Sequence, residues 1–172
     1  MNELPNADKL AHALTLIAEH YGDRCAERSG VPLMNHITEG LQILDRFGAS
    51  DSVKAAFCLH PLLQAPADYK ANSERLATDD MIDVQVFRMA VDYRWAANAY
   101  LCKPETDHWN QHDIHQKVGH LYPELRLLLI ADKEQNQKDF MLYHYNKHER
   151  SGELKRYFHN WLDYLGVSEL KA

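Results

Sequence analysis

Three stretches of this sequence each place a possible metal ligand, a histidine or an aspartate, beside an apolar helical stripe. The first passes through a turn at Gly30 and Pro32 and ends in His36. The second, AAFCLHPLLQ, contains His60, and the third, LLIADKEQN, contains Asp132. Imidazole and carboxylate groups are common ligands of zinc, iron and manganese. Taken singly, such residues are more typical of half-buried core histidines and salt-bridged aspartates.

Taken in order, the three stretches resemble the HD superfamily, and within it the RelA/SpoT type of guanosine tetraphosphate hydrolase. In that family the stretches are roughly R-x-x-x-G-x-P-Y-x-x-H-P, A-A-L-L-H-D-x-V-E-D and L-A-D-R-x-x-N. The order and approximate spacing match over about residues 8–145. The resemblance implies a single HD-domain-like helical bundle over residues 1–172, with a C-terminal helix at about 152–165 outside the matching part.

The resemblance implies a partial metal site. Carried over residue by residue, it assigns His36, His60 and Asp132 as ligands of one divalent ion, manganese, zinc or iron. The family's remaining acidic positions, one ligand and a Glu-Asp pair that acts on the attacking water, are occupied here by Pro61, Gln64 and Ala65. These changes remove an anionic ligand and the proton acceptor of the family reaction. No catalytic residue can therefore be assigned, and we expect a degraded site.

The resemblance also implies a ligand: a nucleotide or another phosphorylated small molecule. Arg24 and Arg28 lie just upstream of the turn, and guanidinium groups bind phosphate well through paired hydrogen bonds. Lys133 takes the position of a family arginine, and Asn136 matches the asparagine that contacts the nucleoside. Without the resemblance, the two arginines are simply solvated surface charges.

These observations favour a divergent RelA/SpoT-like HD protein that binds a phosphorylated small molecule and hydrolyses it weakly or not at all. One alternative is an active metal-dependent phosphohydrolase, or an HD-type oxygenase, that uses the same three ligands. Another is an interaction or regulatory module without a small-molecule ligand, whose aromatic C-terminal helix docks a partner or a second copy in a homodimer. Whether the protein is an enzyme stays open at this point.

A second group of histidines lies in a polar stretch and has spacings of three, four and five residues. On one helix, three of them share a face, so a metal site and a solvated segment are both compatible with the pattern. The group comprises His108, His112, His115 and His120.

Composition excludes several classes of protein. The 172 residues carry 19 basic and 25 acidic side chains, and this net charge of −6 argues against nucleic-acid or membrane-surface binding. A hydrophobic content of 45% excludes a disordered chain. No stretch approaches the roughly 20 apolar residues of a membrane helix, and no signal peptide is visible. Three widely spaced cysteines without a CxxC motif predict a reducing, cytoplasmic location.

The elements that must position the candidate ligands are predicted to be helices. Nearly every apolar pattern has helical spacing, which predicts an all-α fold of about seven helices. We expect Asn35 to cap the helix that carries His36, and Pro123 to stand in the first turn of the helix that carries Asp132.

Proline should interrupt the helix that carries His60. Pro61 removes one backbone hydrogen bond and clashes with the preceding turn, so a kink or break is expected near residues 57–61. Residues 65–80 are polar and are predicted to form a loop, and the His-rich stretch 103–118 is predicted to be a loop or a short helix.

Overall fold

The chain is all-α, as predicted. A computed structural model describes residues 6–27, 29–102, 111–147 and 149–167, and within these ranges it contains nine α-helices, one π-helical turn and no strand. The elements are α1 (Asn6–Tyr21), α2 (Met34–Arg46), α3 (Asp51–Leu59), α4 (Pro61–Gln64), α5 (Pro66–Ala77), α6 (Val84–Ala99), α7 (Gln111–Val118), α8 (Pro123–Asp139), η2 (Phe140–His144) and α9 (Ser151–Tyr164). No helix in the described part of the chain is long and apolar enough to cross a bilayer.

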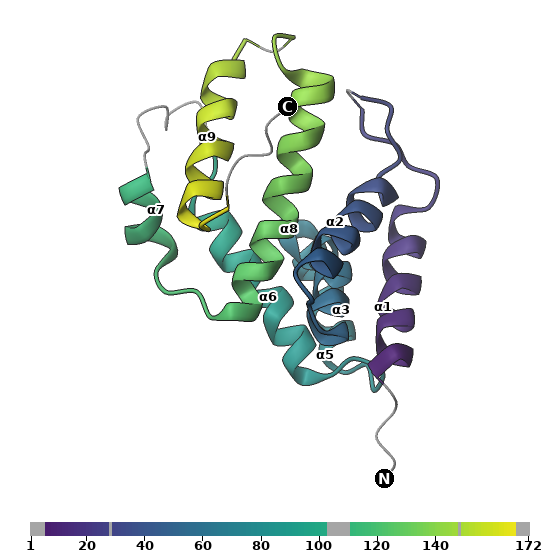
Figure 1. Cartoon of the computed structure of the whole chain (residues 1–172). Coiled ribbons are helices and arrows are strands. Elements are labelled where there is room, and N and C mark those ends of the chain that lie inside the picture. The colour runs from purple at the N-terminus through teal and green to yellow at the C-terminus, as the bar shows by residue number, and fades with distance from the viewer. Residues whose placement is uncertain (1–5, 28, 103–110, 148, 168–172) are drawn as a thin grey trace.

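Helix α8 is the central element of the fold. It runs through the middle of the molecule, with α9 on one side and α2 on the other (Figure 1), and it also packs against α3 and α6. Pro123 stands in its first turn, as expected. Five consecutive residues in its middle, 131–135, are buried although four of them are polar or charged. This part of α8 is therefore shielded from bulk solvent, and its polar groups must find partners inside the protein.

The helix that carries His36 begins earlier than the capping argument predicts. The N-cap of α2 is Leu33, whose backbone is already helical (φ −60°, ψ −29°), and Asn35 lies in the first turn rather than at the cap. The amide N–H of Asn35 donates to the carbonyl of Pro32, and that of His36 donates to Leu33. This tight turn satisfies the first amides of the helix through backbone carbonyls, so no side-chain cap is needed.

Pro61 breaks the third helical pattern where the sequence predicts it. Helix α3 ends at Leu59, and α4 begins with Pro61 as its first residue, a position where the missing proline N–H costs no hydrogen bond. His60 stands at the junction and is 1% exposed. The break thus carries a histidine side chain into the interior.

The predicted loop at residues 65–80 is wrong, because most of it forms α5. Pro66 is the first residue of this helix, and Ala65 before it is extended, as a residue preceding proline prefers, so α4 ends at Gln64. The amide of Asn72 donates to the carbonyl of Leu62 at 3.0 Å, and Leu76 is fully buried. One buried residue in twelve is too weak a stripe to predict from sequence.

The His-rich stretch contains α7, within the predicted alternatives. His108 and the side chain of His112 lie outside the described residues. His115 packs edge-on against the ring of Tyr164, with ring centroids 4.6 Å apart, and His120 is exposed.

Candidate metal centre

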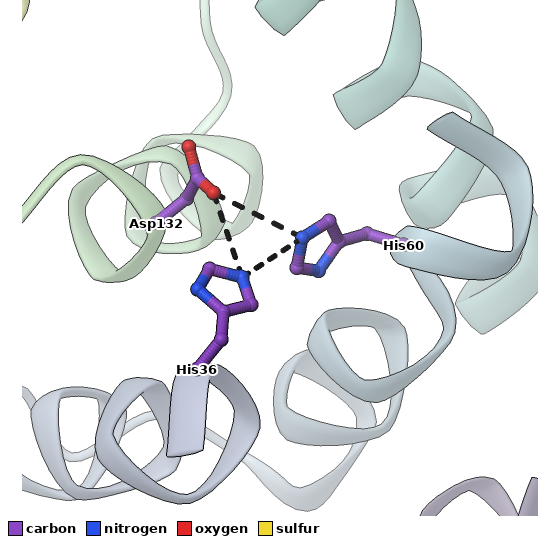
Figure 2. A group of neighbouring side chains, drawn as sticks. All are labelled: His36, His60 and Asp132. Carbon is purple, nitrogen blue, oxygen red and sulfur yellow. Dashed lines mark hydrogen bonds and ion pairs between the residues drawn. The ribbon is translucent and has the colours of Figure 1, made fainter. Parts of the chain in front are cut away.

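Three side chains from distant parts of the chain converge on one point (Figure 2). His36 comes from the first turn of α2, His60 from the junction of α3 and α4, and Asp132 from the middle of α8. The Nε2 atoms of the two histidines are 3.2 Å apart. Oδ1 of Asp132 lies 3.6 Å from Nε2 of His36 and 3.9 Å from Nε2 of His60. The structure thus brings together the three residues predicted as metal ligands, close enough to hold one ion.

The hydrogen bond of His60 fixes its tautomer. Its Nδ1 lies 2.6 Å from the backbone carbonyl oxygen of Phe57, which can only accept a hydrogen bond. Nδ1 therefore carries the proton, and Nε2 presents a lone pair to the centre. Burial, followed by the charge of His36, lowers the pKa of His60 to about 3, so the ring is neutral at physiological pH.

A longer chain of hydrogen bonds fixes the tautomer of His36. Its Nδ1 lies 2.6 Å from Oε1 of Gln135. The amide nitrogen of Gln135 donates to Glu39 at 3.2 Å and to Asp139 at 2.7 Å, and these two carboxylates leave the amide only one orientation. In the neutral form of His36, the Gln135 oxygen accepts the Nδ1 proton and the Nε2 lone pair faces the centre.

Asp132 completes the centre and is held as an anion. Oδ2 lies 2.9 Å from Nζ of Lys133, and Oδ1 accepts a 2.8 Å hydrogen bond from the amide of Asn136. Burial would raise the pKa of the Asp132 carboxyl, but Lys133, followed by His36 and His60, lowers it to about 2. Burial alone would lower the pKa of the Lys133 ammonium, yet the facing carboxylate raises it above its usual value. The two groups form a buried ion pair.

The geometry fits a divalent cation. Two imidazole lone pairs and one carboxylate oxygen face one another with no proton assigned between them, an arrangement that a cation stabilises. Ligand atoms held roughly 2.0–2.1 Å from a tetrahedral zinc ion lie about 3.3–3.4 Å from one another. The separations of 3.2, 3.6 and 3.9 Å bracket that value. The fixed Nδ1–H donors are also what metal-binding histidines require of their surroundings.

The three residues lie on the wall of a cavity of about 540 Å³. Pro61 and Gln64 also line it, so two of the positions where the family has acids face the same space without a carboxylate. Ala65, the third such position, is exposed and lies outside the cavity lining.

The predicted ligand-binding residues divide into two groups. Lys133 and Asn136 line the cavity. Lys133 forms an ion pair with Asp132, and the amide of Asn136 donates a hydrogen bond to the same carboxylate. Arg24 is exposed and outside the lining, and its guanidinium donates to the carbonyls of His20 and Tyr21 at the end of α1. Arg28 lies outside the described residues.

Sequence reasoning missed the residues that orient the ligands. Gln135, Glu39 and Asp139 form the network that holds His36, and the backbone carbonyl of Phe57 holds His60. The sequence contains one signal of these contacts. The polar stretch DKEQNQKD directly follows a strongly apolar run and continues the same helix. A polar helix that follows a core segment without a break predicts buried polar contacts.

Comparisons with protein-family models, curated proteins and solved structures found no match for this chain.

Proposed function

We propose that this chain is a divergent HD-like metalloprotein that binds a phosphorylated small molecule, such as a nucleotide, at a divalent ion held by His36, His60 and Asp132. The observation that carries the proposal is the convergence of two histidine lone pairs and one carboxylate on a shared cavity. When bound, such an ion supplies Lewis acidity toward phosphoryl oxygens. Every other contribution comes from the side chains around it.

The charges around the centre favour an anionic ligand. The negative charge of Asp132 is balanced by Lys133 at 2.9 Å, and imidazoles that hold a metal ion through their lone pairs are neutral. The four side chains together are neutral, so a bound dication keeps an excess of positive charge on the cavity wall. A phosphate group supplies the matching negative charge.

Tyr21 supplies a neutral donor to the same cavity. It is the last residue of α1 and lines the cavity. Burial, followed by the charge of Asp132, raises the pKa of the Tyr21 hydroxyl to about 12, so the group keeps its proton at neutral pH. A protonated hydroxyl beside the centre is suited to donate to a phosphate oxygen.

Weak or absent hydrolysis follows from the groups that replace the family's acids. Gln64 lines the cavity and its amide cannot take up a proton at neutral pH. Asp139, a carboxylate of the lining, accepts from Gln135 at 2.7 Å and lies 3.7 Å from Nζ of Lys138. These contacts make it a poor general base.

The ligand set also supports a second candidate function. Two histidines and one carboxylate with open positions are the set that non-haem iron oxygenases use. Pro61 leaves the fourth family position without an oxygen ligand, which favours this set over the four-ligand one. Binding of iron in preference to manganese and zinc under anaerobic conditions would favour the oxygenase.

The interaction-module alternative loses the observation that suggested it. The aromatic side chains of the C-terminal helix face inward: Trp161 and Tyr164 are buried, and Tyr157 and Phe158 line the cavity. They are occupied with packing and with the cavity.

Metal titration tests the proposed function. We expect wild-type protein, stripped with chelator and titrated with manganese or zinc, to bind one ion per chain, and His36→Ala to lose this binding. His120→Ala changes an exposed histidine outside the cavity and should bind metal like wild type. Far-ultraviolet circular dichroism checks that both variants are folded. Failure of the folded wild-type protein to bind any divalent ion would contradict the proposal.

A further inference from the structure

Three aromatic side chains of the cavity lining pack against one another in a row. Phe140 of η2 packs against Phe158 of α9 with ring centroids 5.5 Å apart, and Phe158 packs against Tyr157 at 5.1 Å. All three residues line the cavity. We call Phe140, Tyr157 and Phe158 the aromatic wall.

The aromatic wall begins next to the metal centre. The ammonium group of Lys133 lies 2.9 Å from Oδ2 of Asp132 and donates to the hydroxyl of Tyr157 at 3.3 Å. The Lys133 side chain therefore links Asp132, a candidate metal ligand, to Tyr157 of the aromatic wall. A small molecule whose phosphate binds the ion can reach the aromatic wall with its other end.

The wall is supported from behind. The ring of Tyr157 stacks on that of Tyr100 with centroids 5.8 Å apart and planes 5° from parallel. The indole N–H of Trp161, a fully buried residue, donates to the carbonyl of Tyr100 at 3.3 Å. Such support fixes the ring positions before a ligand arrives, which lowers the entropic cost of binding.

The third ring of the wall, Phe140, lies where the helix geometry changes. Helix α8 passes at Phe140 into the π-helical turn η2, which the amide of Tyr145 closes by donating to the carbonyl of Phe140 at 2.8 Å. Both Phe140 and His144 of this turn line the cavity. Short π-helical segments are rare and occur frequently at functional sites.

We propose that the cavity selects phosphate monoesters that carry a planar aromatic group, with the ring packed on the aromatic wall and the phosphate at the metal centre. The aromatic wall takes the ring because ring–ring contacts add to the burial of apolar surface. The inference rests on the proposed function for the phosphate end of the ligand, and on the wall alone for the other end.

Binding of small probes to the manganese-loaded protein tests the inference. Phenyl phosphate and glycerol 2-phosphate carry the same phosphate group, and only the first has a ring. Isothermal titration should give phenyl phosphate about tenfold tighter binding than glycerol 2-phosphate. Equal affinities for the two compounds on protein that has bound its manganese would overturn the inference and leave the proposed function standing. A protein that binds no metal would overturn both.

A pair of variants assigns the preference to the wall. Phe158→Ala should weaken phenyl phosphate binding about fivefold and leave glycerol 2-phosphate binding unchanged. Trp95→Ala removes an aromatic ring that is 63% exposed and outside the cavity, and should bind both compounds like wild type. An unchanged preference in folded Phe158→Ala protein would overturn the inference. If that variant does not fold, Phe140→Leu and the wild-type comparison of the two compounds still decide it.

Discussion

The amide oxygen of Gln135 lies 2.6 Å from Nδ1 of His36 across 99 positions of sequence, and this contact selects the ring nitrogen that faces Asp132. Gln135 is 1% exposed, and Glu39 and Asp139 hold its amide nitrogen. Because a flipped amide would place its nitrogen against the Nδ1 proton, the network holds His36 in the orientation that a metal ligand requires.

Replacing Gln135 should weaken metal binding although the residue is not itself a ligand. Gln135→Leu removes the acceptor for the Nδ1 proton, so we expect metal affinity to fall about 10- to 100-fold. Gln42→Leu alters an exposed glutamine of α2 and should keep the wild-type affinity. Isothermal titration with zinc measures both. Wild-type affinity in folded Gln135→Leu protein would show that the tautomer of His36 does not depend on this contact.

Lys133→Met should weaken the metal-free fold and strengthen metal binding. The substitution leaves the Asp132 carboxylate buried without its counter-ion, which costs about 3–5 kcal/mol of unfolding free energy. It also removes a positive charge 2.9 Å from the carboxylate, so a divalent cation should bind more tightly than in wild type.

Urea denaturation with chelator and with zinc separates the two effects of Lys133→Met. Zinc should stabilise this variant more than wild type, whereas Lys70→Met, on the exposed side of α5, should behave like wild type in both conditions. Equal stabilisation of Lys133→Met and wild type by zinc would contradict the charge argument.

His60 should make the metal-free protein sensitive to acid. Its pKa is about 3 in the folded chain and 6.5 as the reference value, so the unfolded chain binds a proton at a higher pH than the folded one. The unfolding free energy is therefore unaffected by His60 protonation above pH 6.5, and it decreases as pH falls from 6.5 toward 3. Between about pH 7 and about pH 4.5, His60→Asn should lose about 2–3 kcal/mol less unfolding free energy than wild type.

Urea denaturation at the two pH values, in chelator, measures this difference. His120→Asn changes an exposed histidine and should show the acid sensitivity of wild type. An acid response of His60→Asn identical to that of wild type would show that His60 is not a neutral, buried imidazole.

Gly40 makes room for the Phe57 ring, which packs against both histidines of the candidate centre. A Cβ atom at position 40 would lie 2.1 Å from Cζ of Phe57, whose ring is fully buried and packs against His36 and His60 at centroid distances of 5.5 and 4.8 Å. Gly40→Ala should therefore cost about 1–3 kcal/mol of stability and lower metal affinity by displacing Phe57. Thermal unfolding and zinc titration check both effects, with exposed Gly152→Ala as the control. Unchanged metal affinity in Gly40→Ala would show that metal binding does not depend on the position of the Phe57 ring.

The sequence predicts the helices and the three candidate ligands because those features are local. Apolar spacing around Ile37, Leu59 and Leu128 marks the helices that carry His36, His60 and Asp132, and Pro61 predicts the break that turns His60 inward. Three short motifs in a fixed order then suggest that the ligands meet.

Other features depend on contacts between distant residues or on small energy differences. The role of Gln135 requires His36 and Glu39, which lie 99 and 96 positions away. The π-helical turn at Phe140 differs from an α-helix by a single step in hydrogen bonding, which composition does not encode. The sequence did not reveal that Lys133 forms a buried ion pair with Asp132, because a lysine beside an aspartate usually faces solvent.

Anomalous diffraction from a crystal grown with manganese or zinc tests the central claim most directly. The account predicts one peak bonded to Nε2 of His36, Nε2 of His60 and Oδ1 of Asp132 in wild-type protein, and no peak at that place in His36→Ala. A wild-type crystal at saturating metal that shows these three side chains together and no metal among them would contradict it.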